Sequence, residues 1–209
     1  NNFNDDGLGH AEYFINNYNR DIEYAKSLNI ETDKSISDLW NDLESNDIKD
    51  RAIAVVDPLN ETRWNQDCFY NEYAPYDNWG PCNRAYAGCV ACAMSQVMKY
   101  WNYPEKGKGS HTYIHHQYGS QSADFGATTY KWDEMPNEIW NQNDAIATLM
   151  YHCGVSVDMD YGADGSGAQS HDVEAAMRMY FGYSSAKYKE RSDYSDEEWI
   201  SLLKSELDE

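Results

Sequence analysis

The sequence predicts a globular α+β protein in which helices outweigh strands. Several runs carry apolar residues at spacings of three and four, the period of a helix that buries one face, and shorter runs alternate apolar and polar residues as half-buried strands do. The 209 residues include 18 tyrosines and 7 tryptophans. Such aromatic richness is the opposite of a disordered composition, and the length suffices for a sizeable core.

The charge balance argues against two classes of partner. The chain has 36 acidic and 16 basic residues, a formal net charge of -20. Binding to nucleic acid or to an anionic membrane surface depends on clustered lysine and arginine, so we expect neither. No run approaches the roughly 20 apolar residues of a membrane-spanning helix, and residues 1–6 lack the features of a secretory signal.

Residues 1–52 differ in character from the rest of the chain. Apolar residues at helical spacing predict a helix over residues 11–28, and Ser35 precedes a second short apolar stripe that ends at Leu43. A strand-like run at residues 52–56 follows and ends before Pro58. We expect this region to be an appendage to a main domain that begins near residue 53.

The centre of the chain, residues 80–104, passes abruptly from turn-forming residues to a helical run. The pattern predicts a helix that starts at the Cys89 boundary and ends near Tyr103, before Pro104. Its expected buried stripe consists of Ala93, Met94, Val97, Met98 and Trp101. Cys89 follows Gly88 directly, so its sulfur is expected to face the unpaired N–H groups at the helix start, which favour a thiolate.

Residues 87–91 (Ala-Gly-Cys-Val-Ala), 96–100 and 102–104 resemble the nucleophile segment of the streptopain family of papain-like cysteine peptidases. The resemblance continues in order across residues 53–209. It includes the segments 64–66, 130–132, 154–162, 181–183 and 191–193. It implies a papain-like fold, protein or peptide substrates, no cofactor, and a secreted or cell-surface bacterial enzyme in which Cys89 forms a thioester with the substrate.

The same resemblance implies further site residues and a domain arrangement. Asn83, six residues before Cys89, stands where the family usually has a glutamine that helps to hold the oxyanion, and the shorter side chain is equally consistent with a plain turn. Gly88 and the stretch Ser166, Gly167 and Ala168 are the implied substrate-binding residues. Residues 1–52 correspond to the tail of an inhibitory prodomain or to a helical linker, and residues 53–209 to the first part of the catalytic domain.

Periodicity predicts the remaining elements. We expect a strand or hairpin arm at residues 111–118, a helix at 144–154 capped by Gly154, a half-buried strand at 155–161, a helix at 172–180 after a Ser170 N-cap, and a helix at 194–207. Ser195 and Glu198 have capping-box spacing at the start of the last helix.

Five cysteines leave at least one thiol unpaired within the chain. They are Cys68, Cys82, Cys89, Cys92 and Cys153, and we expect Cys89 to be free and Cys153 to be a packed thiol. Whether Cys68 and Cys82 form a disulfide stays undecided, because the sequence does not fix the distance between their Cα atoms. We expect no metal site, since neither the Asp158–Asp160 pair nor the cysteines around residue 89 have enough spaced ligands.

The sequence does not contain the expected general base of a cysteine peptidase. The streptopain family takes it from a downstream Gly-Gly-His-Ala segment, which this sequence lacks. Its six histidines are His10, His111, His115, His116, His152 and His171, and none fits that motif. Two explanations stay open. Either the sequence is a piece whose remaining catalytic half is a further partner, or the protein is a catalytically inactive binding module. An alternative from another class is a thiol–disulfide oxidoreductase that uses Cys89 and Cys92.

Overall fold

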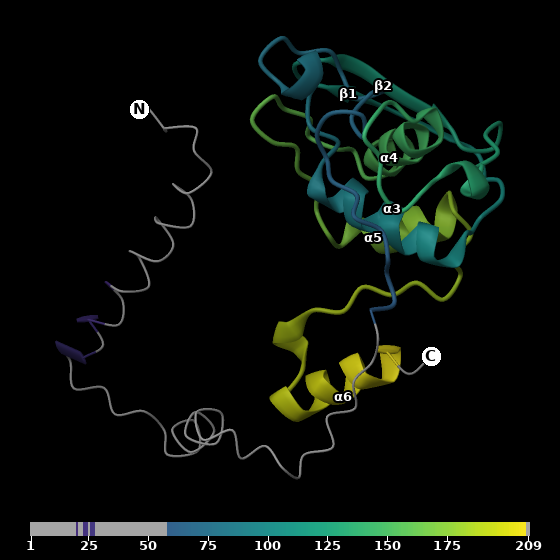
Figure 1. Ribbon diagram of the computed structural model, residues 1–209. Coiled ribbons are helices and arrows are strands. Elements are labelled where there is room, and N and C mark those ends of the chain that lie inside the picture. Colours follow the sequence, from purple (N-terminus) through teal and green to yellow (C-terminus); the bar gives the residue numbers. More distant parts are fainter. Residues whose placement is uncertain (1–19, 21–22, 25, 28–57, 208–209) are drawn as a thin grey trace. The chain divides into compact units, whose positions relative to one another are not determined.

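The computed structural model describes residues 20, 23–24, 26–27 and 58–207 (Figure 1). Chain contacts divide the protein into two units, Asn1–Val55 and Val56–Glu209. Of the helix predicted over residues 11–28, the five described residues are helical, and the elements predicted at 35–43 and 52–56 lie outside the described residues. In the described part of the chain, no helix is both long and apolar enough to cross a membrane.

Two helices form the centre of the second unit. Helix α3 (Cys89–Trp101) packs against α4 (Asp144–Ser156), as Figure 1 shows. The predicted helix is therefore present, but its buried face agrees with the predicted stripe only at Met94 and Met98. Its buried residues are Ala91, Cys92, Met94, Ser95 and Met98, whereas Ala93, Val97 and Trp101 are exposed. The apolar positions span more than one face, so spacing alone did not identify the side that packs on α4.

A β-hairpin also packs against α4. Strands β1 (Ser110–His115) and β2 (Gly119–Asp124) pair antiparallel, from Ser110 opposite Asp124 to His115 opposite Gly119. Both strands contact α4. The predicted hairpin arm at 111–118 is confirmed in its first half. Its polar partner strand, with the sequence Gly-Ser-Gln-Ser-Ala-Asp, has too few apolar residues to show an alternating pattern.

The predicted strand at residues 155–161 is wrong. Helix α4 continues to Ser156, beyond the expected cap at Gly154. Gly154 serves packing instead, because a Cβ there would collide with the Tyr161 hydroxyl. The apolar side chains of the alternating segment are buried as expected. Asp158, however, has a positive φ of 49°, which interrupts extended backbone, and the segment pairs only through the bridge between Asp160 and Gly167.

Shorter elements complete the unit. They are η1 (Pro81–Asn83), η2 (Trp132–Glu134), α5 (Asp172–Met179), η3 (Arg191–Asp193) and α6 (Asp196–Leu207). The N-cap of α5 is His171, not the predicted Ser170. The capping box of α6 is confirmed, since the Ser195 backbone N–H donates to Glu198 Oε2 at 2.9 Å and the Glu198 N–H donates to Ser195 Oγ at 3.4 Å.

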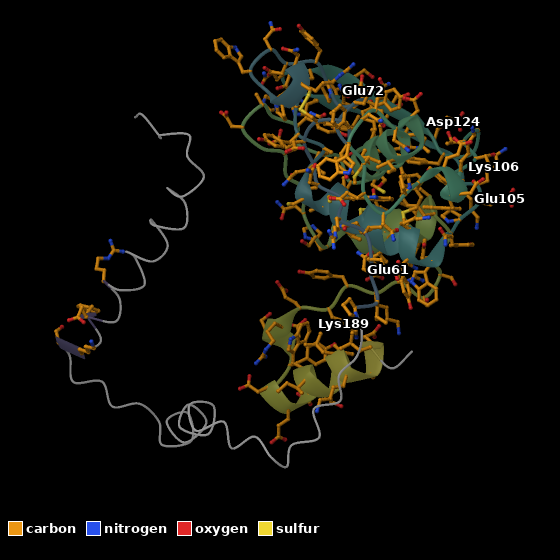
Figure 2. The ribbon with its side chains drawn as sticks, viewed as in Figure 1. Glu61, Glu72, Glu105, Lys106, Asp124 and Lys189 are labelled. Carbon is orange, nitrogen blue, oxygen red and sulfur yellow. A yellow bond between two sulfur atoms is a disulfide. The ribbon has the colours of Figure 1, made fainter. Side chains whose placement is uncertain are left out.

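The core lies between α3, α4 and the chain segments that follow them. Phe125 and Phe181 are fully buried and meet edge to face, with ring centroids 5.4 Å apart, close to the buried side chains of Met98, Leu149 and Met150. Charged side chains such as those of Glu105, Lys106 and Asp124 are exposed (Figure 2). The α+β class predicted from the sequence is confirmed.

Candidate active site

Cys89 is the first residue of α3, and its side chain is an exposed free thiol. The predicted position at the start of the helix is confirmed. Gly88 is the N-cap residue and has no side chain to cap the helix, and the first helical hydrogen bond runs from the Cys92 N–H to the Gly88 carbonyl. The backbone N–H groups of the first turn therefore have no acceptor within the helix and point out of its N-terminal end, where Cys89 lies.

Gly88 is required by its backbone and by its neighbours. Its φ of 96° lies in the region that L side chains rarely adopt. A Cβ at this position would lie 2.6 Å from the Met159 side chain and 3.4 Å from Ser166 Cβ. The glycine thus lets the segment around residues 159–166 approach the start of α3.

The loop before α3 is held by a disulfide and by a buried asparagine. Cys68 and Cys82 are joined, with Cα atoms 5.4 Å apart, which resolves the pairing that the sequence left open. The Asn71 side chain is 1% exposed and its Nδ2 donates to the carbonyls of Pro81 and Ala85, at 2.9 and 3.1 Å. Sequence reasoning missed Asn71, which no local pattern distinguishes from the neighbouring polar residues.

Asn83, the predicted oxyanion residue, lies on this same loop. Its side chain is exposed and its φ is 61°, a left-handed conformation that asparagine tolerates. Its carbonyl accepts a hydrogen bond from the Asp77 N–H at 3.0 Å. The loop therefore fixes the backbone of Asn83 while leaving its amide group available to solvent.

The predicted substrate loop lies beside Gly88. Ser166 Oγ donates to the Tyr86 carbonyl at 2.6 Å and accepts from the Gly162 N–H at 3.0 Å. The Tyr86 N–H donates in turn to the Gly162 carbonyl at 3.1 Å. The Ser166 hydroxyl is therefore occupied, and the N–H and carbonyl of Gly167 are both paired with the backbone of Asp160, so these groups hold the loop in place.

An apolar groove of about 320 Å³ starts at Cys89 and runs along α3. Val90, Ala93 and Val97 line it from α3, and Val173 and Met177 line it from α5. These α3 residues include two that the sequence assigned to the core. The thiol therefore lies at the end of an open apolar surface and not inside a polar cluster.

The other two free cysteines are in different surroundings. Burial raises the pKa of the Cys92 thiol to about 11, with the Cys89 side chain as a lesser cause, and burial raises the pKa of Cys153 to about 12. Cys92 Sγ lies 3.5 Å from the Trp64 carbonyl oxygen, and Cys89 and Cys92 are not bonded to each other. This arrangement gives no support to a redox pair, and the disulfide removes Cys82 as a metal ligand.

None of the histidines in the described part of the chain hydrogen-bonds to Cys89. His152 is 8% exposed in α4, where its Nδ1 meets the Tyr130 hydroxyl at 3.0 Å. Burial lowers the pKa of His152 to about 4. These surroundings are those of a packed core residue, and His10 lies outside the described residues.

Comparison with known proteins gives the family. The model of the peptidase C10 family matches residues 64–209. The chain belongs to the peptidase C10 family. Among curated relatives, streptopain from Streptococcus pyogenes is 37% identical over 136 residues, and the thiol protease/hemagglutinin PrtT from Porphyromonas gingivalis is 36% identical over 155 residues. The matched regions span 34% and 18% of those two proteins, and 59% and 70% of this chain.

Solved structures of C10-like proteins show the same fold. The active wild-type interpain A cysteine protease of Prevotella intermedia is 41% identical with a TM-score of 0.65, covering 71% of this chain and 63% of that one. A fragment of prointerpain A from the same organism, in which one cysteine is replaced by alanine, gives 36% identity and a TM-score of 0.66 and covers 85% of this chain and 64% of that one. The resemblance to streptopain indicated by the sequence is confirmed.

Proposed function

We propose that this chain carries the nucleophile-bearing part of a papain-like cysteine endopeptidase and that Cys89 is its nucleophile. The observation that supports this most directly is the exposed, unpaired thiol at the first residue of α3, in a member of the peptidase C10 family. The Cys89 sulfur forms a C–S bond with the peptide carbonyl carbon, the C–N bond breaks, and water then hydrolyses the thioester.

The oxyanion of the tetrahedral intermediate takes its hydrogen bonds from the start of α3. The backbone N–H of Cys89 is one donor, and the exposed Asn83 amide on the preceding loop is the second. One such donor typically contributes about 10²- to 10³-fold to the rate. Extended substrate lies against Gly88 and against the backbone of the loop that contains Ser166, Gly167 and Ala168. Protein or peptide chains are therefore the proposed substrates.

The base that removes the Cys89 proton and later protonates the leaving amine comes, in this proposal, from the remaining half of the catalytic domain. The apolar groove along α3 supports this, because it is a surface next to the thiol that has no cover in the described part of the chain. The proposed chemistry uses no cofactor. We assign residues 1–52 to the tail of a propeptide, as in a zymogen, and the Cys68–Cys82 disulfide supports export from a bacterial cell.

The decisive experiment compares hydrolysis of an unstructured protein by three proteins. They are the 209-residue chain, a longer chain that continues through a histidine-bearing segment, and the Cys89→Ala variant of the longer chain. Only the longer chain with Cys89 should cleave, because positioned acid–base groups contribute about 10²- to 10⁴-fold. An inactive longer chain would favour a binding module instead, and robust cleavage by the short chain would mean that one of its own histidines is the base.

A further inference from the structure

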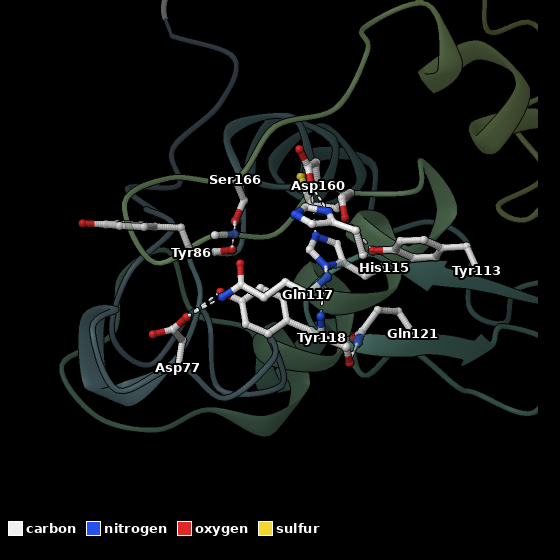
Figure 3. A network of polar contacts seen from close by, with 12 residues as sticks. Asp77, Tyr86, Tyr113, His115, Gln117, Tyr118, Gln121, Asp160 and Ser166 are labelled. Atoms are coloured by element: carbon white, nitrogen blue, oxygen red, sulfur yellow. Dashed lines mark hydrogen bonds and ion pairs between the residues drawn. The ribbon is translucent and has the colours of Figure 1, made fainter.

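A buried histidine closes the hairpin near the candidate site. His115, the last residue of β1, is 4% exposed, and its Nδ1 accepts hydrogen bonds from the backbone N–H groups of Gln117 at 3.1 Å and Tyr118 at 3.2 Å (Figure 3). A ring nitrogen that accepts hydrogen bonds carries a lone pair, so the ring proton is on Nε2. Nε2 is 3.0 Å from Asp160 Oδ1 and therefore donates to that carboxylate.

Asp160 connects this hydrogen bond to the loop beside Gly88. Its backbone N–H donates to the Gly167 carbonyl at 2.8 Å, and the Gly167 N–H donates to the Asp160 carbonyl at 3.1 Å. Ser166, the residue before Gly167, donates from its hydroxyl to the carbonyl of Tyr86, three residues before Cys89. An unbroken series of hydrogen bonds and peptide units thus joins the His115 ring to the chain that enters α3.

The same turn holds the loop that carries Asn83. The Tyr118 hydroxyl donates to Asp77 Oδ2 at 2.6 Å (Figure 3), and the Asp77 N–H donates to the Asn83 carbonyl. The hydrogen bond from Tyr118 and a second from the Trp79 N–H lower the pKa of Asp77, in agreement with an ionised acceptor. The hairpin turn at residues 115–118 therefore contacts both loops that flank the start of α3.

We propose that His115 is a positioning residue. Its Nε2–H bond to Asp160 sets the place of the 160–167 loop beside Cys89, and its Nδ1 organises the turn that holds the Asn83 loop. The proposal rests on the proposed function only where it treats these loops as the substrate-binding walls. The placement of the loops itself depends on the hydrogen bonds alone.

A metal site is the competing explanation for the same residues. His115, His116 and Asp160 have potential ligand atoms within 4.8 Å of one another, which is close enough for one cation to contact all three. A metal on His115 Nε2 would displace the ring proton to Nδ1. That N–H would then point at the two backbone N–H groups of residues 117 and 118, and the turn would have to open. The hydrogen bonds therefore favour positioning over metal binding.

The test uses variants that separate the roles of the two ring nitrogens of His115. In His115→Asn, the amide oxygen replaces the Nδ1 acceptor and preserves the turn, but the side chain is too short to reach Asp160. We expect exchange of the Gly162 and Gly167 amide protons, followed by NMR, to accelerate by roughly ten- to a hundredfold. Asp160→Ala should do the same, whereas Asp160→Asn keeps an acceptor oxygen and should stay close to wild type.

The neighbouring pair gives a matched control. His111 Nε2 lies 2.6 Å from Asp158 Oδ1, so His111→Asn removes a second histidine–aspartate contact between the same hairpin and the same segment. It should leave both glycine amides unchanged. Protection of amides in α4 identifies any variant that has lost its fold, and in that case the comparison of Asp160→Ala with Asp160→Asn decides.

Two further measurements address the ring and the site. The ¹⁵N chemical shifts of His115 should show a neutral ring with its proton on Nε2. Alkylation of Cys89 by a peptidyl chloromethyl ketone should slow several-fold in His115→Asn, while alkylation by iodoacetamide should not change. Unaltered glycine exchange, a proton on Nδ1, or one equivalent of Zn²⁺ bound by wild type and lost in His115→Asn would each overturn the proposal, whereas equal effects on both reagents would overturn only the role of these loops as substrate-binding walls. None of these readouts needs turnover, so an inactive peptidase would overturn the proposed function and leave this result standing.

Discussion

Replacing Gly88 by alanine tests whether the start of α3 depends on a glycine. Gly88 has φ 96° and ψ 140°, and forcing a non-glycine residue into such a region costs about 1–3 kcal/mol. The new Cβ would also lie 2.6 Å from Met159 Sδ and Cε, in a side chain whose end can move, and such overpacking costs about 1–3 kcal/mol. Gly88→Ala should therefore destabilise the protein by roughly 2–6 kcal/mol.

The assay is equilibrium urea unfolding, with thermal unfolding as a second measurement. For a unit of this size each kcal/mol lowers Tm by about 2–4 °C, so we expect a fall of roughly 4–24 °C. Gly167→Ala is the matched control, because a Cβ there meets nothing within 4 Å and the backbone has no positive φ. It should change stability by less than about 0.5 kcal/mol.

A second substitution separates the two costs. In a background of Met159→Ala the collision at Gly88 disappears and only the backbone strain is left, so adding Gly88→Ala should cost less there than in wild type. If Gly88→Ala unfolds at the same urea concentration as Gly167→Ala, the loop around residue 159 does not constrain the start of α3, and our account of this site is wrong.

Three other predictions concern titration and thiols. Burial lowers the pKa of His152 from 6.5 to about 4, so on acidification the unfolded state binds a proton at this side chain before the folded state does. The free energy of unfolding should therefore fall by up to about 3 kcal/mol as the pH drops from about 6.5 to 4. Urea unfolding at several pH values should show a smaller pH dependence in His152→Gln. Reducing the Cys68–Cys82 bond, which closes a loop with a sequence separation of 14, should lower stability by about 3 kcal/mol, measured with and without reductant. Iodoacetamide at neutral pH should label Cys89 well before the two buried thiols, as peptide mass mapping would show, and equal labelling would contradict their burial.

Much of the fold follows from local patterns. The helical spacing before Pro104, the capping box at Ser195 and the alternation that begins at His111 each predicted an element that the structure contains. These signals are local because a helix or a cap satisfies its own backbone within a few residues. The position of Cys89 at the helix start could be predicted for the same reason.

Features that depend on distant partners could not be predicted. Residues 155–161 alternate as a strand does, yet no neighbouring strand is present to pair with them in the described part of the chain. Asn71 acts through carbonyls ten and fourteen residues away, and the bond between His115 and Asp160 spans 45 positions. No spacing in the sequence indicates such contacts, because the loops that make them have no period.

The apolar surface of α3 has a consequence for the proposed mechanism. Val97 and Trp101 are 50% and 58% exposed, although their spacing is that of a buried stripe, and Val97 lines the groove that begins at Cys89. Periodicity identifies apolar faces and does not say which body covers them. A protein segment that fills this groove also lies against the thiol, because Cys89 and Val97 line the same groove. In the proposed enzyme, burial of the α3 face and delivery of the catalytic base to Cys89 are therefore one docking event.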